Sequence, residues 1–156
     1  KAGGIAPLVV LIESGTDGQK QYAAAALAML ATHNAENQAA IAKAGGIAPL
    51  VVLIQSGTDG QKQYAAAALA MLATSNAENQ AAISEAGGIA PLVELVEDGN
   101  DWQTENAAVA LANLALIMTR IRCSLYRPSD RAYDRPHPIS AIRVRGCTCR
   151  SEISTV

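Results

Sequence analysis

The chain has 156 residues, the length of one ordinary domain. Half of its residues are hydrophobic, yet aromatic residues make up only 3% and Phe is absent, which suits closely packed helices with small side chains at their contacts. No apolar run approaches the ~18 residues of a membrane span and no secretory signal is visible, so we expect a cytoplasmic or nuclear protein.

The net charge of −2 combines two regions of opposite sign. Residues 1–116 contain four Lys, no Arg and eleven acidic residues, a net charge of −7. Residues 117–156 contain eight Arg, no Lys and three acidic residues, a net charge of +5, and they hold all three Cys. This change of composition predicts a boundary near residue 116.

The sequence repeats itself every 42 residues. Repeat 1 (residues 1–42) and repeat 2 (residues 43–84) differ at three positions only, and repeat 3 (residues 85–116) is a looser copy. Such a period is typical of helical solenoids, in which each unit buries its apolar face against its neighbours. We therefore predict an all-α array of about three repeats. Because the chain begins inside a repeat and without Met, we expect it to belong to a longer array or to self-associate.

Each copy opens with Gly-Gly and Ile-Ala-Pro-Leu, which predicts a short helix at residues 48–54 of repeat 2. Proline fits the first turn of a helix, where its missing N–H would be unpaired anyway. The following Leu and Val run could also form a buried strand, but Glu94 and Glu97 interrupt it in repeat 3 and favour a helix. Residues 56–60, Ser-Gly-Thr-Asp-Gly, have the composition of a turn.

The longest predicted helix spans residues 61–74, with a buried stripe of small and aliphatic residues. A further helix is predicted at residues 77–86, because Asn76 is suited to cap it and Asn79, Ala82 and Ile83 share one helical face. Gly87-Gly88 ends this helix, since glycine accepts the left-handed conformation that closes helices.

Together these features resemble the armadillo repeat over about residues 1–115. The matching parts are the Glu-Asn-Gln segment (36–38 and 78–80), the Ala-Gly-Gly-Ile-x-Pro-Leu-Val junction and the Leu-x-x-Leu-Ala end of the long helix. A HEAT-type array has a similar period, but it does not explain the Gly-Gly junction before a short second helix.

The resemblance implies a right-handed superhelix whose concave side, lined by the third helix of each repeat, binds an extended peptide or a partner protein. In family members that hold extended peptides, an Asn late in the third helix bonds the peptide backbone, and a Trp one turn earlier often adds packing. The Asn position holds Met29, Met71 and Asn113 here, and the Trp position holds Ala25, Ala67 and Val109. The regular asparagine ladder is thus missing from two of the three repeats.

Helical spacing selects nine candidate partner-binding residues, three from each third helix, which fall at i, i+3 and i+7. The candidates are Tyr22, Ala25, Met29, Tyr64, Ala67, Met71, Asn106, Val109 and Asn113. Because repeats 1 and 2 are nearly identical, we expect their two sets to form equal binding sites. The alternative is that the methionines fill the core between adjacent helices and the tyrosines cover its edge. We interpret Trp102 as a partly exposed cap over the acidic end of repeat 3 and not as a binding hot spot.

These patterns favour a non-catalytic scaffold for protein–protein interaction. A basic partner is expected near repeat 3, where the carboxylates form a solvated acidic surface (Glu94, Glu97, Asp98, Asp101 and Glu105). Two alternatives stay open: the substrate-recognition arm of a larger enzyme, such as an armadillo-containing ubiquitin ligase, and a structural spacer or truncated fragment without independent function.

No motif predicts catalysis, a cofactor or a metal. The Gly-Gly pairs lie between helices and not in a strand–helix phosphate loop. His33 is replaced by Ser75 in the next repeat, and Cys123, Cys147 and Cys149 with His137 lack the usual spacing of zinc ligands.

Residues 117–156 are predicted to form an irregular tail in which the repeat is lost. The long helix of repeat 3 is expected to run on to about Arg122, and Pro-containing steps disfavour helix beyond it. Its Arg residues are interspersed with acids, so no nucleic-acid partner is expected. We interpret this tail as disordered or as a sequence read in a non-native frame or through an intron.

Overall fold

The computed structural model describes the backbone of residues 2–125 and the side-chain surroundings of residues 3–115, and all elements in this part are helical. In chain order they are η1 (Ala2–Gly4), α1 (Ile5–Ser14), α2 (Asp17–Ala31), α3 (Ala35–Lys43), α4 (Ile47–Ser56), α5 (Asp59–Ala73), α6 (Ala77–Glu85), α7 (Ile89–Asp98) and α8 (Asp101–Leu125). The predicted all-α fold is therefore confirmed. The short second helix and the long third helix both begin earlier than predicted, at Ile47 and Asp59.

The early start of the third helices is explained by their caps. Thr58 accepts a hydrogen bond from the backbone N–H of Gln61, and the Gln61 side chain accepts one from the N–H of Thr58 at 3.1 Å. This reciprocal capping box satisfies two N–H groups of the first turn, so the helix begins directly after Thr58. Thr16 and Asn100 play the same role in front of α2 and α8.

The glycine pairs close the first helices as predicted. Gly45 and Gly87 have φ values of 77° and 75°, in the left-handed region that favours glycine. Their partners need glycine for lack of space: a Cβ on Gly46 would lie 2.9 Å from Cγ2 of Ile41 and 3.2 Å from Cγ2 of Val9. Each pair therefore both reverses the chain and lets α4 or α7 approach the preceding repeat closely.

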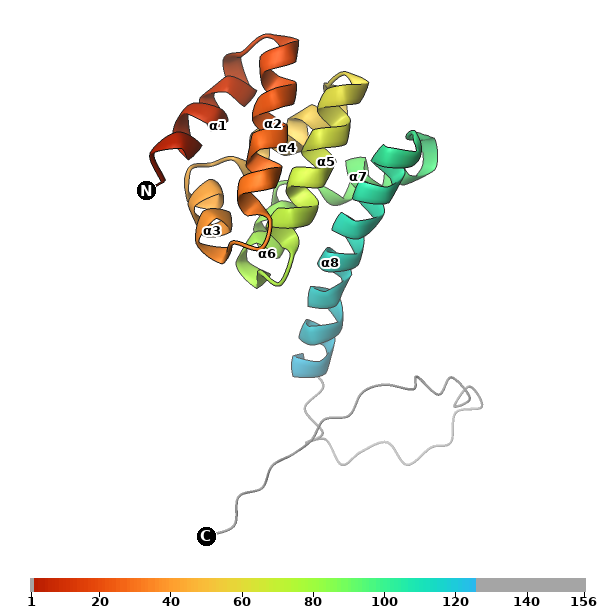
Figure 1. Ribbon diagram of the computed structural model, residues 1–156. Helices are drawn as coiled ribbons and strands as arrows, with labels where there is room; N and C mark the ends of the chain where they lie inside the picture. The colour runs from red at the N-terminus through yellow and green to blue at the C-terminus, as the bar shows by residue number, and fades with distance from the viewer. Residues whose placement is uncertain (1, 126–156) are drawn as a thin grey trace, which may run out of the picture. The chain divides into compact units, whose positions relative to one another are not determined.

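Repeats stack through equivalent helices, so that α2, α5 and α8 lie side by side (Figure 1). The core between them consists of small and aliphatic side chains, of which Leu27, Leu69 and Leu72 are fully buried. Alanines such as Ala66 and Ala70 have no exposed surface, which allows close contact between neighbouring long helices.

Buried glutamines join neighbouring repeats. The Nε2 group of Gln61 donates to the backbone carbonyl of Asp17 at 3.0 Å, and Gln103 donates to that of Asp59 at 2.9 Å. At the other end of the helices, Gln38 donates to the carbonyl of Met71 at 3.0 Å. These bonds fix the register between neighbouring repeats, because a slipped stack would leave buried amides unpaired.

Helix α8 continues across residue 116 and ends at Leu125, close to the end expected near Arg122. In repeats 1 and 2 the third helix stops before a left-handed residue, His33 or Ser75, each with a φ of 53°. Repeat 3 has Leu116, Ile117 and Met118 at the positions of Thr74, Ser75 and Asn76, so it lacks both the turn and the cap. The rest of the predicted tail, residues 126–156, lies outside the described residues.

Within residues 2–125, no single helix combines the length and the apolar character needed to cross a membrane. Helices α3 and α4 taken together have the length and composition of a membrane-spanning segment, but a bend of 80° separates them.

Candidate functional site

The nine candidate residues lie on α2, α5 and α8, and we call the side of these helices that carries them the third-helix face. On α2 this face is open to solvent: Tyr22 is 72% exposed and Met29 is 78% exposed. On α5 the equivalent Tyr64 and Met71 are partly buried and pack against the core. The two sets of residues therefore share a sequence but not an environment, and the expectation that they form equal sites is wrong.

An aromatic pair explains part of this difference. The rings of Tyr64 and Trp102 meet edge to face, with centroids 6.1 Å apart and an interplanar angle of 76°. Trp102 stands in α8 at the position that Gly60 occupies in α5, so Tyr22 has no such partner. Trp102 remains 52% exposed, in keeping with the expected partly exposed cap.

The two candidate asparagines of α8 are engaged within the array. Asn113 donates to the carbonyl of Ala70 at 3.1 Å and to the hydroxyl of Thr74 at 3.2 Å, which ties α8 to α5. Asn106 donates to the carbonyl of Trp102 at 2.8 Å and so holds the first turns of α8. Between them, Val109 is 43% exposed.

The remaining candidates, Ala25 and Ala67, are partly buried, and as small side chains they leave room above the helices. The acidic residues of repeat 3 are all exposed (Glu94, Glu97, Asp98, Asp101 and Glu105). Asp101 directly precedes Trp102 and Glu105 follows it by three residues, so carboxylates accompany the indole in the first turns of α8.

In the described part of the chain, no group of three or more His, Cys, Asp or Glu side chains has the arrangement of a metal site. His33 is exposed at the turn between α2 and α3. Of the other residues considered for zinc, Cys123 belongs to the part of α8 without described side chains, and His137, Cys147 and Cys149 lie outside the described residues.

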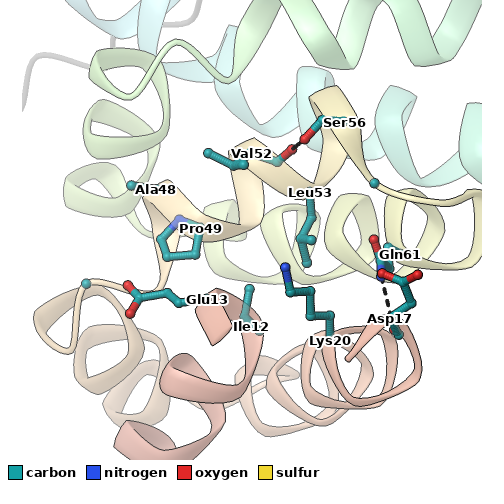
Figure 2. Close-up of a pocket in the computed structure, with 12 residues that line it drawn as sticks. Ile12, Glu13, Asp17, Lys20, Ala48, Pro49, Val52, Leu53, Ser56 and Gln61 are labelled. Atoms are coloured by element: carbon teal, nitrogen blue, oxygen red, sulfur yellow. Dashed lines mark hydrogen bonds between the residues drawn. The ribbon is translucent and has the colours of Figure 1, made fainter. Parts of the chain in front are cut away.

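A pocket between repeats 1 and 2 was not foreseen from the sequence. This first junction pocket has a volume of about 540 Å³ and lies between α1, α2, α4 and α5. Figure 2 shows the Lys20 side chain reaching into it beside Leu53, with Asp17 bonded to Gln61 on one side and Glu13 on the other. A smaller second junction pocket, of about 210 Å³, lies between repeats 2 and 3. The repeat itself was the available signal. Most residues that line the first pocket have an equivalent, 42 positions later, that lines the second.

We compared the chain with known protein families and solved structures. The model of the armadillo/β-catenin-like repeat matches residues 34–74 and 76–116. The comparison with curated proteins gave no significant match.

Several engineered proteins of known structure have the same fold. One is 39% identical, with a TM-score of 0.70 over 72% of this chain and 46% of its own. A designed armadillo repeat protein in complex with the peptide (KR)4 is 30% identical, with a TM-score of 0.70 over 77% of this chain and 52% of its own. A third, computationally designed for modular peptide recognition, is also 30% identical, with a TM-score of 0.69 over 83% and 59%.

This chain spans about half the length of these structures. The family model covers more than half of the chain, and the solved structures agree with it in fold. The chain belongs to the armadillo/β-catenin-like repeat family.

Proposed function

We propose that this chain is a non-catalytic binding module whose third-helix face forms the concave surface of the solenoid and holds an extended peptide or a segment of a partner protein. The observation that carries this proposal is the Tyr64–Trp102 pair, which presents a half-exposed aromatic surface on a rigid helical frame. Aromatic side chains give large contact areas at low cost in conformational entropy, and they are enriched in recognition surfaces.

The chemistry of repeat 3 favours a basic segment. Asp101 and Glu105 flank Trp102, and residues 1–116 carry a net charge of −7. A Lys or Arg side chain over the indole gains about 0.5–2 kcal/mol from cation–π attraction, and the carboxylates add long-range attraction. The designed relative that binds (KR)4 supports the same class of ligand for this fold.

Repeat 1 extends this surface with a different chemistry. Tyr22 and Met29 are both largely exposed, and Met adapts to irregular apolar shapes. A ligand that lies along the third-helix face therefore meets an adaptable apolar area on α2 and an aromatic, acidic area on α8. The contacts act in series, so that several weak contacts combine into one useful affinity.

The test uses Trp102 as a built-in probe, because it is the only Trp in the chain. We expect a (Lys-Arg)4 peptide to change its fluorescence in a saturable way, with an affinity that falls as salt is added. A (Gly-Ser)4 peptide should give no change.

A variant with Tyr22, Met29, Tyr64 and Met71 all replaced by Ala should lose most of this binding. The matched control is Val93→Ala, which removes a side chain that is 40% exposed on α7. Isothermal titration calorimetry on both variants provides the readout, with circular dichroism to confirm that each is folded. Unchanged affinity in the fourfold variant would refute binding on the third-helix face, and no binding of either peptide by the unaltered chain would favour the spacer interpretation.

A further inference from the structure

The two junction pockets are one cavity that occurs twice, one repeat apart. Equivalent residues, 42 positions apart, line both of them: Ile12 and Ile54, Asp17 and Asp59, Lys20 and Lys62, Pro49 and Pro91, Leu53 and Leu95, Gln61 and Gln103. The cavity is therefore a product of how the repeats stack and not a local irregularity of packing.

The chemistry of the pocket changes from one junction to the next. Val52 and Ser56 line the first pocket, and Glu94 and Asp98 take their places in the second. On the rim of the first pocket Val52 is 54% exposed, and Glu13, Asp17 and Lys20 bring two carboxylates and one ammonium group to its lining. The second combines three carboxylates with one ammonium group, because Asp59 and Lys62 also line it.

These pockets do not belong to the third-helix face. Lys20 lies two residues before Tyr22 in α2, which corresponds to a rotation of about 200° around the helix axis. The side chain that enters the first pocket and the candidate residues of the third-helix face therefore point to opposite sides of the same helix. A ligand in the junction pockets would leave the third-helix face free.

We propose that the junction pockets form a second docking surface, which takes an extended segment of a partner protein with an aliphatic side chain in the first pocket and a Lys or Arg side chain in the second. The aliphatic position is argued from the apolar side of the first pocket, where Pro49, Val52 and Leu53 line a volume of about 540 Å³. The basic position is argued from charge complementarity with Glu94 and Asp98.

The repeat spacing sets the spacing of the partner's residues. Packed helices lie about 8–10 Å apart, and a chain in the extended polyproline II conformation advances about 3.1 Å per residue with three residues per turn. Side chains three residues apart then lie about 9 Å apart on the same side of the chain, as in Leu-x-x-Arg or Arg-x-x-Leu. This motif differs from the continuous basic peptide proposed for the third-helix face.

The probe is a fluorescein-labelled peptide with a central Leu and an Arg three residues away on each side, which covers both chain directions. We measure its anisotropy with the full chain and compare it with peptides in which Leu is replaced by Ser or both Arg by Glu. The Leu, Arg peptide should bind, and either replacement should weaken binding about tenfold, the effect of losing one buried aliphatic side chain or one charge contact. Equal binding of all three peptides would overturn the proposal.

The chain supplies a matched pair of variants. Val52→Glu gives the first pocket the chemistry of the second, and Val10→Glu places the same charge at the equivalent position of repeat 1, where the valine is 56% exposed and lines neither pocket. We expect Val52→Glu to weaken binding about tenfold through loss of the aliphatic contact and Val10→Glu to leave it unchanged. Equal effects of the two variants would contradict docking in the first pocket.

A double variant, Glu94→Val with Asp98→Ser, tests the basic position. It gives the second pocket the residues that the first pocket has at the equivalent positions, Val52 and Ser56. It should weaken binding of the Leu, Arg peptide about tenfold. Trp102→Ala should leave this binding unchanged while it reduces binding of the (Lys-Arg)4 peptide. If Trp102→Ala removes binding of both peptides, the ligand occupies the third-helix face and the second docking surface is refuted.

Discussion

Repeats 1 and 2 have nearly the same sequence, yet equivalent side chains are buried to different degrees. Leu30 is 37% exposed, whereas Leu72 is fully buried. Gln19 is exposed, whereas Gln61 is 2% exposed and bonds to Asp17 of the preceding repeat. Because the residues are the same, the difference comes from the neighbours: repeat 2 packs between two repeats and repeat 1 against only one. Burial in this fold is thus a property of the stack.

On the third-helix face, too, the neighbouring repeat determines the surroundings of a side chain. Tyr22 and Tyr64 have identical local sequences, but only Tyr64 meets an aromatic partner, since Trp102 stands where repeat 2 has Gly60. One substitution in repeat 3 therefore changes the surface of an otherwise unchanged repeat 2.

The largest expected effect comes from truncating the equivalent leucines. Leu72→Ala should lower the free energy of unfolding by about 2–5 kcal/mol, because it leaves a cavity in the core. Leu30→Ala should cost about 1 kcal/mol or less, because that side chain is already partly in water. Urea unfolding followed by circular dichroism measures both. Equal shifts of the midpoint would show that repeat 1 is covered as fully as repeat 2.

A smaller difference is expected at the capping glutamines. Gln61→Ala removes a bond within the capping box and two bonds to Asp17 of repeat 1, and we expect a loss of about 1–3 kcal/mol. Gln19→Ala removes only the local cap, at about 1 kcal/mol or less. The comparison uses the same urea titration. If Gln19→Ala costs as much as Gln61→Ala, the bond between repeats contributes nothing to stability.

The smallest expected effect concerns the turn after the third helix, a feature in which repeats 1 and 2 should behave alike. His33 and Ser75 both have a φ of 53°, a conformation that costs an ordinary residue about 1–2 kcal/mol but glycine very little. After the entropy cost of glycine, His33→Gly and Ser75→Gly should each stabilise the protein by about 0.5 kcal/mol. Thermal unfolding of the two variants gives the readout. A destabilising effect, or a clear inequality between them, would contradict the equivalence of the two turns.

Much of the fold could be predicted because its local signals are strong and repeated. Asn76 caps α6, and Gly87 ends it with a left-handed conformation, as expected. The bounds of the third helix were less accurate, since the turn composition of residues 56–60 concealed the Thr58–Gln61 capping box. The continuation of α8 past residue 116 was predicted to about Arg122, because the segment that would start the next repeat is missing, and the helix ends at Leu125.

The surface was harder to predict, because it depends on contacts between repeats. Tyr22 and Met29, which helical spacing assigned to one face, are both largely exposed. Helical spacing could not show that Met71 is partly buried while Met29 is exposed, or that Trp102 reaches Tyr64. The junction pockets were missed for the same reason, because each is lined by residues of two successive repeats.

The most direct test of this account is amide hydrogen exchange, resolved by residue with NMR, in α2 and α5. The two helices have the same 15-residue sequence, so their intrinsic exchange rates are equal and any difference reports the surroundings. We predict that amides of Ala65–Ala73 exchange at least about tenfold more slowly than those of Ala23–Ala31, because α5 is packed on both sides. Equal protection of the two helices would contradict the claim that neighbouring repeats determine burial and stability.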